Sequence, residues 1–579
     1  MTAAEKTPEQ TPAQTAIAAG LGRTFLGVIL TLGLALLLAG AGGFWYLTAN
    51  SPLALRSGGD RPIAAATAFV PSQSPLTFSL LTQPDRLIAF QQASAATSQR
   101  EQGRDEVTQL KQTLLERTGL DYDRDIQPWI GSEVTFAFTD KDLDSEAAGA
   151  QPGYLVAMEI APERQQAARE FLQLLWQRQS LAGNLPISER MSGVRLLYSQ
   201  SKAAIASALV GDQLILFAND VRVLRHSIRA SQTAMNLAQN RAYRETVAKL
   251  PAERIGLAYV DTASLGELSR PPGSDPAAVV KPSFAAIGLG LTRSGLVANA
   301  RLAALSSSQR SRLNSFRSAE AVPLSEPIAV PPEALTFLPG SSSLALASRD
   351  LTQIAPALTA RGIPIDVLPN FFQVGHEASA WDWATADYAL GQTGSANDWI
   401  LAVAKKNTQE TTRENAGVAR LDEVAIAQGY SAVPITLGEA QATAWTRFKA
   451  PDVSKSRRQP SSTGLETEIL GLHLQQRSAE SDYEIFASSL DAMESALAAP
   501  ADSLLNSERF LQALAPLSQP NQGYFYADWS KIAPAAGRAW PAFNLISVAA
   551  RPFLRHIDVI SATRQGDAAS FFIQLTSDD

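Results

Sequence analysis

A long uncharged segment near the N-terminus is the first feature of the hydrophobic pattern. Residues from Thr24 to Leu47 contain no charged side chain, and the charges that flank them are Arg23 and Arg56. As a helix this segment would be roughly 36 Å long, which is enough to cross a hydrocarbon core of about 30 Å. The pattern therefore predicts one N-terminal transmembrane helix over residues 24–47.

Aromatic residues stand at the end of this segment. Phe44, Trp45 and Tyr46 are predicted to anchor the helix, because aromatic rings favour the interface between lipid and water. The segment is also longer than the apolar core of a cleaved signal peptide, which spans about 7–15 residues. We therefore expect an uncleaved, single-pass membrane protein whose partner here is the lipid bilayer. A short leader before a very large body favours a cytoplasmic N-terminus, with the body in the periplasm or the thylakoid lumen.

The rest of the chain alternates between strand and helix patterns. The segment Val134–Phe138 alternates between apolar and polar residues, as in a half-buried strand. Elsewhere apolar residues recur at helical spacing, for example Val221, Leu224 and Ile228. Several predicted strands are joined by short turns, so we expect an α+β fold with largely antiparallel sheets.

The same order of core and turn residues occurs twice along the chain. The matches are mostly inward-facing positions, so the pattern predicts an internal duplication of packing rather than a repeated active site. The matched segments are Phe69-Val70-Pro71 with Phe337-Leu338-Pro339, Val221, Leu224 and Ile228 with Leu490, Met493 and Leu497, Phe217 with Phe486, Tyr259-Val260-Asp261 with Tyr526-Ala527-Asp528, and Thr292-Arg293-Ser294-Gly295 with Thr563-Arg564-Gln565-Gly566.

This repeat predicts two related α+β lobes behind the membrane helix. Serine, charged residues and prolines between the two copies mark a linker. The predicted parts are a flexible N-terminal tail (1–23), the transmembrane helix (24–47), a juxtamembrane linker (48–65), the first lobe (66–305), a second linker (306–332) and the second lobe (333–579).

Composition narrows the classes of function. The chain has 579 residues, which is too long for one compact core. It contains no cysteine, which excludes disulfides, thiol catalysis and cysteine-ligated metal. Its net charge of −7 argues against a nucleic-acid partner, because phosphate binding needs clustered lysine and arginine.

Four segments of the chain resemble a known family. They are GLDYDRDIQPWIG (119–131), PGYLVAMEI (152–160), VGDQLILFAND (210–220) and RIGLAYVD (254–261), and they are similar to the cyanobacterial family called domain of unknown function 3352. The similarity is strong in the first predicted lobe and weak in the second, where the match to DYDRDIQPW is loose. The resemblance implies a membrane-anchored cyanobacterial protein without an assigned reaction, so it supplies no catalytic residues.

Three aspartates have the spacing of a calcium-binding loop. Asp121, Asp123 and Asp125 occupy positions 1, 3 and 5 of such a loop. The loop also needs glycine at position 6 and glutamate at position 12, where this chain has Ile126 and Ser132. We therefore expect a solvated turn before a strand, with a weak cation site as the alternative, and we predict no cofactor.

Four aromatic residues lie close together in the second predicted lobe: Trp381, Trp383, Tyr388 and Trp399. If exposed, they would form a binding surface for pigment, sugar or protein. If buried, they would belong to the core, which is the commoner place for large aromatic side chains.

The sequence contains no complete catalytic motif. The four histidines do not have metal-ligand spacing, and the SxxK pattern that begins at Ser199 is not accompanied by SDN or KTG. We therefore predict a non-enzymatic binding or assembly protein at a membrane surface, with a membrane protein as its partner. The alternative is an extracytoplasmic hydrolase whose active site the sequence spacing does not reveal.

Overall fold

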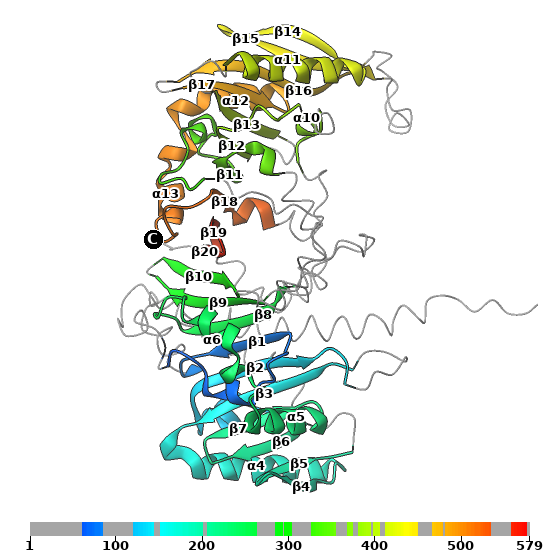
Figure 1. Ribbon diagram of the computed structural model, residues 1–579, viewed down its shortest axis with the longest axis vertical. Helices are drawn as coiled ribbons and strands as arrows, with labels where there is room; N and C mark the ends of the chain where they lie inside the picture. The colour runs from blue at the N-terminus through cyan, green and yellow to red at the C-terminus, as the bar shows by residue number, and fades with distance from the viewer. Residues whose placement is uncertain are drawn as a thin grey trace, which may run out of the picture.

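The strands of the described chain form one antiparallel sheet. The structure is a computed structural model that describes residues 59, 61–84, 120–143, 151–200, 205–262, 284–292, 294–303, 326–354, 368–374, 380–394, 398–405, 411–449, 466–478, 481–533 and 557–575. The sheet has 20 strands, and it runs the length of the molecule, with the β4 edge at one end and the β14 edge at the other (Figure 1).

The first half of the chain supplies strands β1 to β10. They are β1 (Leu76–Leu80), β2 (Ile130–Asp140), β3 (Gly153–Ile160), β4 (Ile187–Met191), β5 (Val194–Tyr198), β6 (Ala206–Val210), β7 (Leu214–Ala218), β8 (Gly256–Asp261), β9 (Phe284–Leu291) and β10 (Gly295–Leu302). The α-helices of this half are α4 (Gln165–Leu181), α5 (Val221–Gln232) and α6 (Arg241–Val247), and short helical turns include η3 (Ala65–Phe69) and η5 (Tyr122–Ile126).

The second half supplies strands β11 to β20. They are β11 (Leu344–Arg349), β12 (Asp387–Thr393), β13 (Asp398–Lys405), β14 (Ser431–Leu437), β15 (Ala440–Lys449), β16 (Glu466–Arg477), β17 (Asp482–Ala487), β18 (Tyr524–Asp528), β19 (Ile557–Gln565) and β20 (Ala568–Leu575). The α-helices are α10 (Asn370–Gln373), α11 (Thr411–Ala427), α12 (Leu490–Ala498) and α13 (Glu508–Leu514), and η8 (Glu333–Phe337) begins this half.

The two halves pair their strands in the same way. Strands β1 to β10 correspond in order to β11 to β20, and each pairing within the first half has its counterpart in the second. The order across the sheet is β4-β5-β6-β7-β3-β2-β1-β8-β9-β10-β20-β19-β18-β11-β12-β13-β17-β16-β15-β14.

The halves join where β10 pairs with β20. Asn299 lies opposite Ser570 in this pairing, and Ser570 Oγ donates a hydrogen bond to Asn299 Oδ1 at 2.9 Å. The core also crosses the junction, since Leu296 shares one buried cluster with Trp529 and Ile557.

The prediction of two lobes, each with its own sheet, is therefore wrong. Hydrophobic periodicity specifies which face of a strand is buried, but it does not say whether an edge strand finds a partner. The outer backbone groups of β10 and β20 would remain unpaired in separate lobes, and pairing the two strands satisfies them.

The prediction of a single-pass membrane protein also needs correction. Among the residues that the structure describes, no helix is long and apolar enough to cross a membrane. The predicted span over 24–47, with Phe44, Trp45 and Tyr46, lies outside the described residues.

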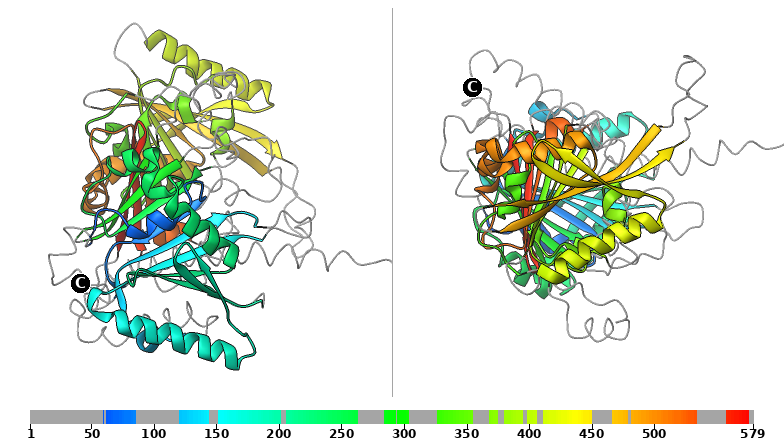
Figure 2. Two further views of the ribbon diagram at one scale, coloured as in Figure 1. Left: turned by 60° about the horizontal axis from the view of Figure 1, so that its bottom comes forward. Right: turned by 90° about the horizontal axis from the view of Figure 1, so that it is seen from above.

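Helices cover both faces of each half (Figure 2). In the first half, α4 packs Phe171 and Leu175 on one face of the sheet, and α5 packs Leu224 and Ile228 on the other. Asp220 begins α5 by accepting a hydrogen bond from the backbone N–H of Arg222. In the second half, α11 and α12 take the corresponding places, so α4 and α11 are the long helices near the two ends of the sheet.

Candidate functional site

Charged side chains are buried beneath α11. Lys405 at the end of β13 and Glu484 of β17 are each 3% exposed, and His473 of β16 is 6% exposed. Lys405 Nζ lies 2.7 Å from one Glu484 carboxylate oxygen, and His473 Nδ1 lies 2.7 Å from the other. One buried carboxylate thus binds two basic side chains.

The strand register brings these residues together. His473 lies opposite Phe486, and Lys405 lies opposite Asp482. Glu484 is midway between Asp482 and Phe486, on the same face of β17, because side chains alternate along a strand. All three buried groups therefore face α11.

Helix α11 completes the cluster. Asp422 Oδ1 lies 3.1 Å from His473 Nε2 and accepts a hydrogen bond of 2.7 Å from Trp445 Nε1. Nearer the start of the helix, Asn415 Oδ1 accepts a hydrogen bond of 3.0 Å from Lys405 Nζ. Both ring nitrogens of His473 therefore contact a carboxylate, and the ionic cluster (Lys405, Asp422, His473 and Glu484) fastens α11 to the sheet.

The electrostatics of the ionic cluster favour its charged form. Burial alone would favour a neutral imidazole, but the hydrogen bonds to Asp422 and Glu484 raise the pKa of His473 to about 9. Burial also opposes ionisation of Glu484, yet the contacts with His473 and Lys405 lower its pKa. The pKa of Asp422 is lowered against the same opposing effect, through hydrogen bonds from His473 and Trp445. At neutral pH the imidazolium of His473 thus faces two carboxylates, and Lys405 Nζ lies against one of them.

The first half has a hydrogen bond between helix and sheet at the corresponding place, but neither partner is charged. Ser207 of β6 lies opposite Phe217, as His473 of β16 lies opposite Phe486. Trp176 of α4 donates a hydrogen bond of 2.8 Å from Nε1 to Ser207 Oγ. A neutral bond therefore holds α4 at the place where the charged pair holds α11.

The neighbouring positions differ in the same way. Ile160 ends β3 as Lys405 ends β13, and Ile215 precedes Phe217 by two residues as Glu484 precedes Phe486. Both isoleucines belong to the buried apolar core. Since burying charge is costly and the first half folds with uncharged residues at the corresponding positions, the ionic cluster is a specialisation of the second half.

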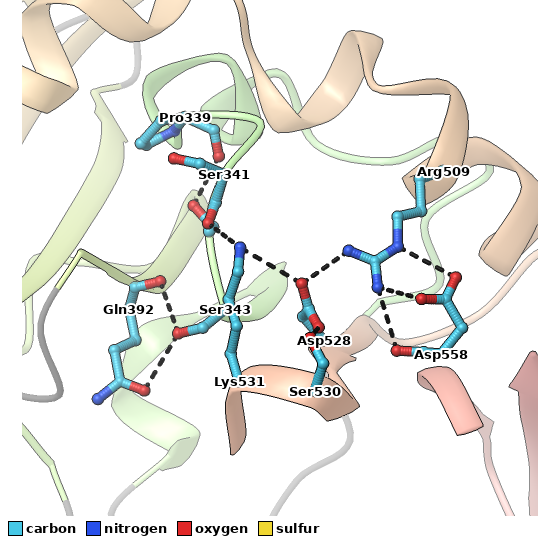
Figure 3. A network of polar contacts seen from close by, with 10 residues as sticks. Pro339, Ser341, Ser343, Gln392, Arg509, Asp528, Ser530, Lys531 and Asp558 are labelled. Atoms are coloured by element: carbon cyan, nitrogen blue, oxygen red, sulfur yellow. Dashed lines mark hydrogen bonds and ion pairs between the residues drawn. The ribbon is translucent and has the colours of Figure 1, made fainter. Parts of the chain in front are cut away.

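A second polar network ties α13 to the sheet (Figure 3). Asp528, at the end of β18, is 1% exposed and accepts hydrogen bonds of 2.7 Å from both Arg509 Nη1 and Ser530 Oγ. Arg509 also pairs with Asp558, and Lys531 Nζ lies 3.3 Å from Asp528. Burial opposes ionisation of Asp528, but the bonds from Arg509 and Ser530 lower its pKa. This network is a structural joint between α13, β18 and β19.

The two outermost strands are the remaining candidate. Within the described residues β4 pairs only with β5, and β14 pairs only with β15. Ser192 and Gly193 have φ values of 50° and 85°, so the β4–β5 hairpin turns through a two-residue type I′ loop. Hydrogen-bonded pairs then alternate from Met191, and the backbone groups of Ser188 and Arg190 point away from the sheet.

The β14 edge, at the other end of the sheet, differs from β4 because it contains a proline at an outward-pointing position. Gly438 has a φ of 60° in the two-residue turn of the β14–β15 hairpin, and Leu437 lies opposite Ala440. Counting from this turn places Pro434, opposite Thr443, at a position whose backbone points outward. Proline has no N–H to donate, so it interrupts this edge as a template for another strand.

The predicted calcium-loop aspartates serve the chain itself. The Asp121 carboxylate accepts a hydrogen bond from the Arg124 backbone N–H at the start of η5. Asp125 is buried, and the hydrogen bonds from Arg124, with support from Arg178, lower its pKa to about 2. Asp123 lies in the same turn, and no group of three metal-binding side chains occurs in the described part of the chain.

The predicted aromatic surface is largely interior. Trp381, Trp383 and Tyr388 are buried in one core cluster beneath α11, and Trp399 packs partly buried against it. Trp381 Nε1 donates to the carbonyl oxygens of Phe372 and Val374, which closes its polar edge. These four residues therefore lie together without forming an open surface.

Neither the ionic cluster nor the uninterrupted edge at β4, which we call the open edge, was predicted from the sequence. The cluster draws its members from α11 and three strands, so their spacing carries no motif. In the sequence, the one signal of the cluster was charge directly beside apolar runs, at Lys405 after residues 400–404 and at Glu484 before residues 485–487. For the edges of the sheet, the signal was Pro434 within a strand pattern, because proline in a sheet is confined to edge strands and bulges.

Comparisons with known proteins give a family but no activity. The family model described as "Protein of unknown function (DUF3352)" matches residues 28–574. A comparison with curated proteins found no match. A solved structure titled "Structure of crystal form I of TP0453" is similar at 11% identity and a TM-score of 0.24, covering 44% of this chain and 85% of that chain. The family model supports neither the cyanobacterial origin nor the membrane anchor that the resemblance implied. The chain belongs to the DUF3352 family.

Proposed function

We propose that the protein is a non-enzymatic binding protein that takes up an extended partner segment along β4. One observation carries the proposal: the two ends of the sheet are built alike, yet only β14 is interrupted by proline. At β4, Ser188 and Arg190 both keep an outward backbone N–H. Main-chain pairing to such an edge is a common way for one protein to bind another.

The ionic cluster supports a binding role over a catalytic one. Each charged group in it lies against a group of opposite charge, and both nitrogens of His473 are engaged. A general base needs a free position from which to take a substrate proton. The cluster is instead suited to holding α11 rigidly on the sheet.

Site-specific photo-crosslinking in the cells that make the protein tests the proposal. A benzophenone amino acid replaces Ser188 in β4, or Thr436 in β14, whose backbone also points outward on the other edge. We expect crosslinked adducts from position 188 and few from 436. Arg190→Pro should remove the adducts, because it blocks the edge, whereas Arg190→Ala should keep the edge open. Equal adducts from both edges, or adducts that survive Arg190→Pro, would overturn the proposal.

A further inference from the structure

Two arginines lie directly opposite each other at the open edge. Arg190 of β4 faces Arg195 of β5, and both side chains are exposed. Their pair is a non-hydrogen-bonded one by the count from the hairpin turn, in which facing side chains approach most closely. Like charges in this arrangement destabilise a hairpin.

Neither guanidinium has a carboxylate partner among the described residues. Arg195 Nε donates to Ser188 Oγ at 2.9 Å, which is a neutral contact. The nearest acidic residue along the strand is Glu189, but its side chain points to the other face and binds Arg225 at 2.6 Å. The face that carries Arg190 and Arg195 therefore has positive charge without compensation in this hairpin.

Three other arginines on strands of the sheet face an acid, whereas Arg301 and Arg564 lie opposite alanines. In these three cases the acid lies directly opposite the arginine in the register and forms an ion pair with it. These pairs are Arg349 with Asp387, Arg447 with Glu468, and Arg477 with Asp482. Arg190 and Arg195 at the open edge instead face each other. They lie where a strand added to β4 would place new side chains beside them.

We infer that the partner segment of β4 carries an aspartate or glutamate beside Arg190. This inference rests on the proposed function, since it names the chemistry of the partner at that same edge. A residue directly opposite Arg190 on an added strand would share its face, with Cβ atoms about 4.5–5.5 Å apart. A carboxylate there pairs with Arg190 and offsets the repulsion from Arg195.

The same geometry argues against a second copy of this chain as the partner. Two β4 strands paired about their centre would gather Arg190 and Arg195 from both copies on one face. Leu181 and Leu185, in the segment just before β4, are 90% and 72% exposed and offer apolar contact to a different partner. The occupant that fits is an extended acidic segment of another protein that also carries apolar residues.

Selection from a display library of random ten-residue peptides tests the inference on the full chain. The wild-type chain should enrich peptides with aspartate or glutamate among apolar residues. The double variant Arg190→Glu/Arg195→Glu should bind those peptides at least about tenfold more weakly. Ser188→Pro should abolish binding, because it places a proline at an outward position as in β14. Circular dichroism checks that each variant is folded.

The outcomes separate the inference from the proposed function. Enriched peptides that lack acidic residues but need an open β4 overturn the acidic partner and leave strand addition in place. If no peptide is enriched although position 188 gives crosslinks in cells, the acidic partner is again overturned and strand addition remains in place. Peptides that bind Ser188→Pro as well as wild type overturn strand addition itself.

Discussion

At the scale of single residues, the contrast between the two halves is the most informative feature. The first half uses Trp176 and Ser207 to hold its long helix, while the second uses Asp422 and His473. The neutral bond costs little to bury. The charged one is stable only while Glu484 and the other members keep each charge compensated. Substitutions at the two sites should therefore change the free energy of unfolding by different amounts.

Replacing His473 with alanine should strongly destabilise the attachment of α11. The change leaves two carboxylates near one lysine, and breaking a buried ion pair in this way costs about 3–5 kcal/mol. The matched variant Ser207→Ala removes one neutral hydrogen bond and should cost about 1 kcal/mol. Hydrogen exchange, read separately for α11 and α4, measures both. Similar opening of the two helices would contradict the assignment of a charged cluster.

Stability should also fall as the pH rises through the pKa of His473. Its pKa is about 9 in the folded chain and near 6.5 when unfolded, so the folded state binds the proton more tightly. The stabilisation is complete below pH 6.5 and is lost by about pH 9, with a total of about 3 kcal/mol. Urea unfolding at several pH values checks this. The slope should be absent in His473→Ala, and a flat wild-type profile would refute it.

At the scale of elements, the buried face of a helix could be predicted from local spacing. Val221, Leu224 and Ile228 were expected to share one helical face, and in α5 Leu224 and Ile228 are buried in one core cluster with Val221 packed partly buried against it. The contacts of α11 could not be predicted, because they join residues far apart in the sequence. One such contact is with Trp383, whose ring lies against the helix backbone at Gly417.

Gly417→Ala should therefore destabilise the protein. An added Cβ would lie 2.2 Å from Trp383 Cδ1 and 2.5 Å from its Cγ, so the helix or the ring must move. Overpacking of this kind costs about 1–3 kcal/mol, whereas glycine to alanine within a helix usually gains about 0.5–1 kcal/mol. Urea unfolding shows whether the substitution lowers or raises the free energy of unfolding. Glu423→Ala, on the exposed side of α11, is the control, and a more stable Gly417→Ala would contradict the packing.

At the scale of the whole molecule, the junction of β10 and β20 determines how many edges the sheet offers. Two separate halves would expose four edge strands. Within the part of the chain that the structure describes, the joined sheet exposes two, and Pro434 interrupts one of them. The repeated core pattern was readable in the sequence, but the junction was not, because Asn299 and Ser570 carry no signal of their contact. The special status of β4 thus depends on a contact that only the structure reveals.

A disulfide across this junction tests whether β10 and β20 join the two halves into one sheet. The chain has no cysteine, so Asn299→Cys with Ser570→Cys introduces one pair only, at positions whose side chains touch. Asn299→Cys with Phe571→Cys is the control, because Phe571 faces the other side of the sheet. We expect rapid intramolecular disulfide formation in the first pair and little in the second, read by electrophoresis without reductant. Equal formation in both pairs, or bonds only between molecules, would contradict a single sheet with one open edge.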